Sequence, residues 1–202
     1  MKIESHDFRK PSRLASELEQ QLVAWLRGGC SLVAEKWAKH MGVAVEHVFE
    51  GNDAARPDSA LAELPDTALA YCVTVGAEAM NTMLIFPRPL LLTLVAGMLG
   101  DSCTQIASDR GMTPVEESLA EYLLQHLLQA VQESWPTNVP VAVRLKNAES
   151  TPKRTRLFGA AENLVLCRFA MRGPFGGQPW YWLIPQEGLV ELLSRQNDGL
   201  EI

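Results

Sequence analysis

The chain has 202 residues, of which 47% are hydrophobic and 21% are charged, values typical of a globular protein long enough to bury a core. The formal net charge of −6 argues against nucleic acid and against an anionic membrane surface as the main partner, because both attract clustered positive charge. The longest apolar run, from Pro89 to Gly100, is too short to cross a bilayer, so we expect no direct membrane insertion.

The first half predicts one helix, three strands and a second helix. Apolar residues at helical spacing run from Pro11 to Trp37, and Gly28 and Gly29 predict a kink or a break within them. The alternating or apolar runs predict strands at 43–49, 67–75 and 80–86. Residues 51–66 are rich in turn formers and predict a loop with at most one helical turn. A short apolar helix at 87–99 and a polar connector at 100–111 complete this half.

The second half opens with the best-signalled helix of the chain, residues 113–135. Thr113 is a good N-cap, Pro114 suits the first helical position, and Glu116 completes a capping box. Its apolar positions predict a broad buried face and are Val115, Leu119, Tyr122, Leu123, Leu124, Leu127, Leu128, Val131 and Trp135. Strands are predicted at 139–147, 163–171 and 180–184, the last two as a hairpin, and a helix at 185–195.

The two halves share one element order, and three landmarks recur at one spacing. Trp37 and Trp135 close the long helices, Val43 and Val141 open the next strand, and Pro87 and Pro185 precede the last helix. Each pair is 98 residues apart (135 − 37, 141 − 43 and 185 − 87), which indicates an internal duplication. We therefore predict a flexible segment at 1–10, one domain at 11–196 with repeats at about 11–100 and 111–196, and a tail at 197–202.

Four stretches, in this order, resemble the middle domain of the flagellar motor switch protein FliM, within the broader CheC-type phosphatase family. They are AEKWAKHMGVAVEHV, PDTALAYCVTVGAEAMNTMLIFPRPLLLTLVAGMLG, MTPVEESLAEYLLQHLLQAVQESW and WYWLIPQEGLVELL. The resemblance implies an α/β (α+β) fold with a pseudo-two-fold repeat of helix–strand–strand–strand–helix, its helices packed on a mostly antiparallel sheet.

The same resemblance implies that the chain acts by binding proteins in a flagellar motor switch or chemotaxis complex. Family members carry a Gly-Gly-x-Gly loop after the first-half helix that is implicated in contact with another switch component. Here that place reads Leu99-Gly100-Asp101-Ser102, with one glycine, so Gly100 and Asp101 are candidate binding residues. A subunit of a type III secretion ring is the alternative within the binding class. Either role implies a location in the cytoplasm, at the cytoplasmic face of a membrane-embedded complex.

An enzymatic alternative is a CheC-like phosphatase acting on a phosphorylated response regulator. Such phosphatases place Glu and Asn at ExxN spacing on a long helix, because an amide orients the attacking water. Glu121 aligns with the family's Glu, but Leu124 occupies the place of the Asn. Glu17 and Gln20 offer a carboxylate and an amide at the same spacing, outside the repeat register. We therefore predict no catalytic site, with Glu17, Gln20 and Glu121 as the alternative.

Two further groups of residues are candidates for protein binding. The most basic stretch lies at 146–156. Together with the neighbouring Arg144 it gathers Lys146, Lys153, Arg154 and Arg156, which suits an acidic partner if it is more than a solvated loop. The run at 180–182 places Trp180 and Trp182 on one face of a strand, either outward as interface anchors or inward as core.

No cofactor and no metal site are predicted. The four histidines form no HxxxH or HExxH pattern, and the four cysteines form no CxxC pair. The expected partners are other switch, chemotaxis or secretion proteins, with a response regulator and a second copy of the chain as further options.

Overall fold

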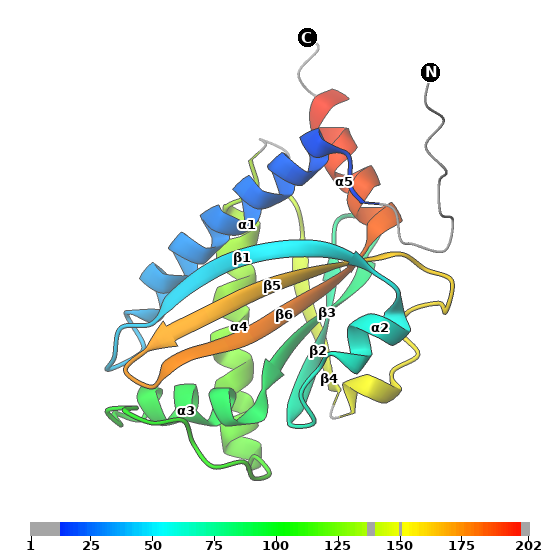
Figure 1. The fold of residues 1–202 in the computed structure, drawn as a ribbon. Coiled ribbons are helices and arrows are strands. Elements are labelled where there is room, and N and C mark those ends of the chain that lie inside the picture. The colour runs from blue at the N-terminus through cyan, green and yellow to red at the C-terminus, as the bar shows by residue number, and fades with distance from the viewer. Residues whose placement is uncertain (1–12, 137–139, 150, 199–202) are drawn as a thin grey trace.

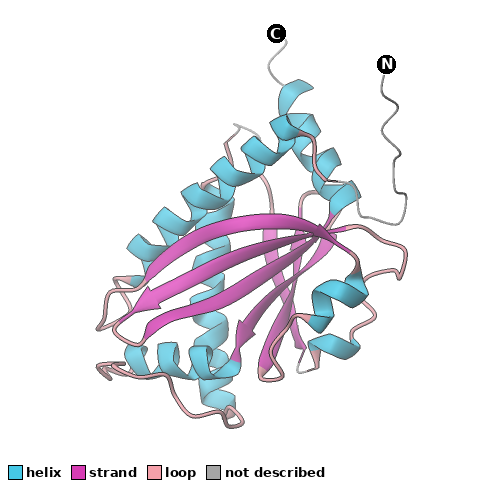
Figure 2. Ribbon diagram, viewed as in Figure 1, coloured by secondary structure: helices cyan, strands magenta, loops and turns pink. Residues whose placement is uncertain are grey.

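The computed structural model describes residues 13–136, 140–149 and 151–198, so the predicted segment 1–10 and residues 199–202 of the predicted tail lie outside the described residues. The elements are α1 (Ser16–Trp37), β1 (Glu46–Ala55), α2 (Pro57–Ala62), β2 (Ala68–Val75), β3 (Met80–Pro87), α3 (Arg88–Met98), α4 (Pro114–Glu133), β4 (Val143–Glu149), the 3₁₀ segment η1 (Pro152–Arg154), β5 (Leu164–Gly173), β6 (Gly176–Pro185) and α5 (Gln186–Asp198). Figures 1 and 2 show a twisted sheet with the long helices α1 and α4 on one face and α2 on the other.

The sheet confirms the predicted pseudo-two-fold repeat. Its six strands lie in the order β1-β5-β6-β3-β2-β4, and all neighbours are antiparallel. If β1, β2 and β3 are exchanged for β4, β5 and β6, respectively, the same strand order results when the sheet is read from its other edge. At the centre Leu84 pairs with Trp182, and these two positions are themselves 98 residues apart (182 − 84). The approximate symmetry axis therefore passes between β3 and β6.

Helix α1 is continuous from Ser16 to Trp37, so the break predicted at Gly28 and Gly29 is wrong. The two glycines instead allow α1 and α4 to approach closely. A methyl group on Gly28 would lie 3.2 Å from Ser134 Cβ, and one on Gly29 would lie 3.3 Å from Val131 Cγ2. The helical cost of glycine, about 1 kcal/mol each, is offset by packing against the second half.

Strand β1 extends well past its predicted end at Phe49. A bulge between Phe49 and Gly51 shifts the register, and pairing with β5 then continues to Ala55. The turn formers of this stretch are tolerated because the bulge accommodates an extra residue and β1 is an edge strand of the sheet. The short helix α2 follows at once, where the sequence predicted a loop with one helical turn.

The main core lies between the sheet and the two long helices. Trp25 Nε1 donates to Val131 O at 2.7 Å, and Trp37 Nε1 donates to Leu123 O at 3.1 Å. Two tryptophans of the first half are thus bonded to the backbone of the central helix of the second half. Within the described part of the chain, none of the helices combines the length and the apolar character needed to cross a bilayer.

Candidate protein-docking site

The connector between α3 and α4, residues 99–113, occupies the place where the resemblance predicted a binding loop. Figure 1 shows it running from the far end of α3 back to the start of α4, at one end of the molecule. Local sequence explains both ends. The last residue of α3 is followed by Leu99 and by Gly100, whose φ of 95° favours glycine. Thr113 then starts α4 with the predicted capping box, in which its side chain accepts from Glu116 N.

Buried hydrogen bonds hold the middle of the connector against α3. Cys103 Sγ lies 3.2 Å from Thr93 O, and Ala107 N donates to Thr93 Oγ1 at 2.8 Å. Cys103 adopts a φ of 50°, and its amide donates to Asp101 Oδ1 at 2.9 Å. Burial raises the pKa of the Cys103 thiol, and the nearby Asp101 raises it further, so this cysteine is a protonated packing residue.

Ion pairs hold the surface of the same connector. Arg88 makes a two-bonded pair with Asp109 at 2.8 and 2.9 Å, and Arg110 does the same with Glu116 at 2.5 and 2.9 Å. Hydrogen bonds from Arg110 and from the Thr113 amide lower the pKa of Glu116 to about 2. A loop held at several points loses little conformational entropy when a partner binds, which favours binding.

Large apolar side chains are exposed at the start of this preorganised connector and just after its end. Leu99 is 73% exposed and Val115 is 69% exposed. Val115 was predicted to lie in the buried face of the helix, and it is exposed because the first turn of α4 extends beyond the core. Gly100 and Asp101 are also exposed, between Leu99 and the buried Cys103. Exposed apolar side chains on a rigid frame suit binding of a protein, and they offer no group for catalysis.

The predicted basic residues lie together, away from the connector. Arg144 and Lys146 are exposed on β4, Lys153 and Arg154 on η1, and Arg156 just after it. Lys153 pairs with Asp66 at 2.6 Å and lowers the pKa of that carboxyl, first through the hydrogen bond. Their position at a sheet edge keeps them available as candidate binding residues.

Of the two orientations left open for Trp180 and Trp182, the structure has the inward one, so naming them as outward-facing binding residues is wrong. Trp180 is 2% exposed and Trp182 is fully buried. The ring of Trp180 stacks on Phe169 at 3.8 Å, and Trp182 Nε1 donates to Thr82 Oγ1 at 2.9 Å. Both point to the face covered by α1 and α4, and the intervening Tyr181 points to the other face, where α2 lies. Alternation along β6 was predicted correctly, but not which face the long helices cover.

The residues of the enzymatic alternative do not form a common site. Glu17 and Gln20 are exposed on the first turns of α1, whereas Leu124, next to the half-buried Glu121 on α4, is 1% exposed. Burial raises the pKa of Tyr71 to about 12, with smaller contributions from Glu121 and Glu117, so the surroundings of Glu121 are acidic.

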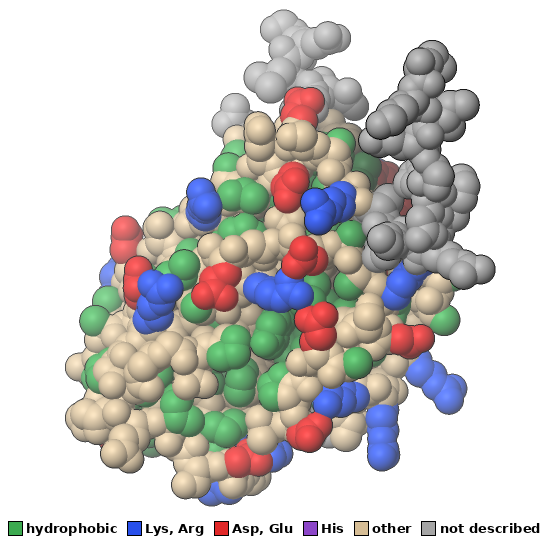
Figure 3. All heavy atoms as spheres, viewed as in Figure 1, with side chains coloured by type: hydrophobic (Ala, Val, Ile, Leu, Met, Phe, Trp, Pro, Cys, Tyr) green, Lys and Arg blue, Asp and Glu red, His purple; other side chains and the backbone are tan. Residues whose placement is uncertain are grey.

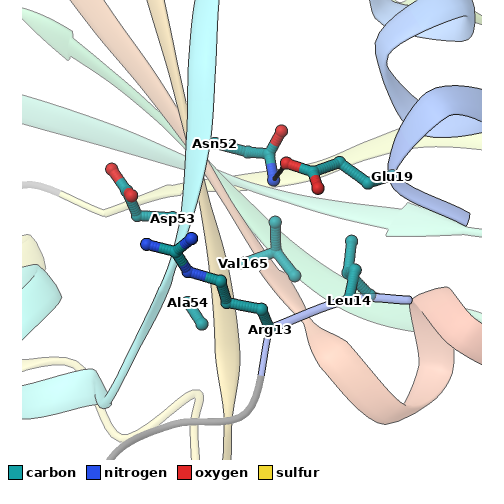
Figure 4. A pocket seen from close by; sticks show the side chains of 7 residues that line it. All are labelled: Arg13, Leu14, Glu19, Asn52, Asp53, Ala54 and Val165. Atoms are coloured by element: carbon teal, nitrogen blue, oxygen red, sulfur yellow. Dashed lines mark hydrogen bonds between the residues drawn. The ribbon is translucent and has the colours of Figure 1, made fainter. Parts of the chain in front are cut away.

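A carboxylate and an amide do meet elsewhere, in a cavity of about 110 Å³ where the start of α1 lies beside β1 (Figure 4). Asn52 Nδ2 donates to Glu19 Oε1 at 3.3 Å. Arg13 and Asp53 also line the cavity, together with the apolar side chains of Leu14, Ala54 and Val165. Neither Glu19 nor Asn52 was singled out from the sequence. Among the described residues, no group of three or more His, Cys, Asp or Glu side chains is placed to hold a metal ion.

The fold defines a class of protein. The FliM middle domain of H. pylori matches with a TM-score of 0.77 at 14% identity, over 90% of this chain and 99% of that one. A chain of the FliG–FliM complex from H. pylori matches with a TM-score of 0.79 at 13% identity, over 88% of this chain and 100% of that one. A CheC-like superfamily protein from Shewanella sp. PV-4 matches with a TM-score of 0.53 at 8% identity, over 80% and 97%. The fold is thus that of FliM middle domains, with CheC-like proteins more distant.

The sequence narrows this class to one family. The family model for the flagellar motor switch protein FliM matches residues 60–177, so the chain belongs to the FliM family. The FliM protein of Treponema pallidum is 20% identical over 165 residues, which are 82% of this chain and 48% of that protein. The chain spans about half the length of this curated relative. The family predicted from the four sequence stretches is confirmed.

Proposed function

We propose that this chain is a non-enzymatic, protein-binding component of a flagellar motor switch, and that it binds another switch protein of the FliG type through the α3–α4 connector. Its membership of the FliM family supports the switch role, and the existence of a FliG–FliM complex with the same fold supports the type of partner. The observation that carries the proposal is the connector itself, held rigid by Thr93, Arg88 and Arg110 and exposing Leu99 and Val115.

The test is binding of the full chain to the FliG-type protein of the same organism, measured by calorimetry. Leu99→Ser and Val115→Ser each remove exposed apolar area, and we expect each to weaken binding about tenfold, a loss of about 1.4 kcal/mol. Tyr122→Ser is the matched control, because Tyr122 is also exposed on α4 (40%) but lies two turns beyond Val115. Unchanged affinity in both connector variants, or an equal loss in the control, would exclude the connector as the docking site.

With this role, we expect the protein to act at the cytoplasmic face of a membrane-embedded complex. A type III secretion ring subunit would use the same kind of docking, and copurification from the native host separates the two systems. Recovery of flagellar switch proteins supports the proposal, whereas recovery of secretion proteins alone contradicts it.

The phosphatase alternative has a direct test. The chain is incubated with a phosphorylated receiver domain, and release of phosphate is followed over time. We expect no acceleration, because the amide that would orient water beside Glu121 is replaced by the buried Leu124. Acceleration that is lost in Glu17→Ala or Glu121→Ala would overturn the non-enzymatic assignment.

A further inference from the structure

The charges of the described chain are paired unevenly. Seven cations make ion pairs with carboxylates, namely Lys36, Arg88, Arg110, Lys153, Arg168, Arg172 and Arg195. At the edge formed by β4 and η1, four exposed cations make none within the described residues: Arg144, Lys146, Arg154 and Arg156. We call these four residues the basic edge. The other described cations without an ion pair, Arg13, Arg27, Lys39 and Arg56, are spread over other elements, so half of the eight gather at this one edge of an acidic chain.

The fold brings the basic edge together although it spans two separate elements. Strand β4 is the last strand of the sheet and pairs with β2. Segment η1 also lies against β2, so Arg154 returns to the same border as Arg144 and Lys146. In Figure 3, Lys and Arg side chains project from the side of the molecule where Figure 1 places β4 and η1. Four like charges held at one border raise the local positive potential.

The opposite border of the sheet is built differently. On β5, next to the edge strand β1, Arg168 pairs with both Asp53 and Glu63, and Arg172 lies 3.9 Å from Glu46. Both arginines of β5 at that border are therefore paired with carboxylates of the same chain. The absence of such pairs at the basic edge is therefore not a general property of the sheet borders in this fold.

Two features favour an acidic protein over other polyanions. Asp66, paired to Lys153, and Glu149 at the end of β4 lie within the same border and interrupt the positive field. The whole chain carries a charge of −6, which repels a long polyphosphate or an anionic bilayer on either side of so small a patch. A short segment rich in Asp and Glu can place its carboxylates on the four cations and avoid the two acids.

We propose that the basic edge is a second docking site, which binds an acidic segment of a partner protein through ion pairs with Arg144, Lys146, Arg154 and Arg156. This site is separate from the α3–α4 connector, so binding here does not depend on the switch role proposed above. Because all four side chains are exposed, the attraction is long-ranged, speeds up association and weakens as salt is added.

The test uses a fluorescein-labelled peptide of ten glutamates and fluorescence anisotropy at low and at moderate salt. We expect binding that weakens as salt rises, and a loss of about tenfold in the double variant Arg154→Glu/Arg156→Glu, because reversing each charge removes an attraction and adds a repulsion. The matched control is Arg27→Glu/Lys39→Glu, which reverses two exposed, unpaired cations at α1 and should change the affinity less than about twofold. Urea unfolding of each variant verifies that the fold is retained.

Three outcomes would overturn the proposal. The first is no measurable binding of the peptide at low salt. The second is an equal loss in both double variants, which would mean attraction to net charge alone. The third is tighter binding of a thymidine oligonucleotide or of phosphatidylglycerol vesicles than of the peptide, also lost in Arg154→Glu/Arg156→Glu, which would assign the edge to nucleic acid or lipid.

Discussion

Positions 98 residues apart are equivalent in the two halves of this fold, yet several carry residues of different kinds. His47 on β1 pairs with Met171, and its counterpart Leu145 on β4 pairs with Val73, so the registers correspond. A buried histidine in one half thus has a leucine as its counterpart in the other. The two halves share a symmetric backbone but differ in side chains at equivalent positions. Replacing a residue of one half by its counterpart from the other half therefore measures how much that difference contributes to stability.

The largest loss of stability is expected at the symmetry axis, where residues of the two halves pair with each other. Trp182→Ala removes a fully buried ring and leaves Thr82 Oγ1 without its donor. We expect a loss of about 3–5 kcal/mol in the free energy of unfolding, from urea titration. Leu84→Ala, at the position that pairs with Trp182, should lower the free energy of unfolding by about 2–5 kcal/mol. We expect each variant to unfold in a single transition. Two separate transitions would show that the halves unfold independently.

The second effect is a pH dependence at position 47, where the first half carries a titratable residue and the second half does not. His47 lies edge-to-face with Trp37 at 4.6 Å, and among the described residues neither of its ring nitrogens has a hydrogen-bond partner. Burial lowers the pKa of His47 from 6.5 to about 3. The unfolded chain therefore binds the proton more readily, and the free energy of unfolding falls as pH drops below 6.5, by up to about 1.4 kcal/mol per unit, until about pH 3.

The counterpart residue supplies the matched variant for this prediction. His47→Leu places the apolar residue of the second half at the equivalent position and should flatten the stability profile between pH 6.5 and pH 4, measured by urea titration at each pH. An equally steep profile in His47→Leu would assign the acid sensitivity to other groups.

A smaller difference separates the starts of the two long helices. Thr113 caps α4 with a complete capping box, whereas its counterpart Ala15 leaves the start of α1 without a side-chain cap. Thr113→Ala should lower the free energy of unfolding by about 1 kcal/mol, and Ala15→Asp should raise it by about 0.5–1 kcal/mol. Thermal unfolding of both variants measures the difference, and a shift in the same direction for the two would contradict it.

The smallest effect is expected at the two borders of the sheet. Arg168→Ala breaks the pairs with Asp53 and Glu63, and because these groups are partly exposed the loss should be no more than about 1 kcal/mol. Arg144→Ala breaks no pair and should leave the free energy of unfolding unchanged within about 0.5 kcal/mol. A clear destabilisation by Arg144→Ala would mean that the basic edge serves the fold.

Much of this architecture could be predicted from sequence, because its signals are local. The capping box at Thr113, the hairpin before Pro185 and the spacing of 98 each depend on neighbouring residues or on counting. The errors concern packing between distant segments. From the sequence alone, Gly28 and Gly29 predict a break in the helix. Their close approach to Val131 and Ser134, which the sequence does not show, is what the two glycines allow.

The candidate sites were harder to predict than the fold. The alternation at 180–182 assigns two faces but not the face that α1 and α4 cover, so the burial of both tryptophans could not be settled. The exposure of Leu99 and Val115 depends on where the core ends along α3 and α4, and no local pattern records that. The basic stretch was visible in the sequence, but it did not show that four of its five cations make no ion pair within the described residues.

The strand order has a consequence for how such a domain can be made. Each half pairs its first strand with the other half: among the strands of the described residues, β1 has β5 as its one neighbour, and β4 has β2. A half on its own would leave that strand without a partner, as in a subunit that is complete only after domain swapping with a second copy. The α3–α4 connector joins the two exchanging units into one molecule and thereby turns a concentration-dependent assembly into an intramolecular folding reaction.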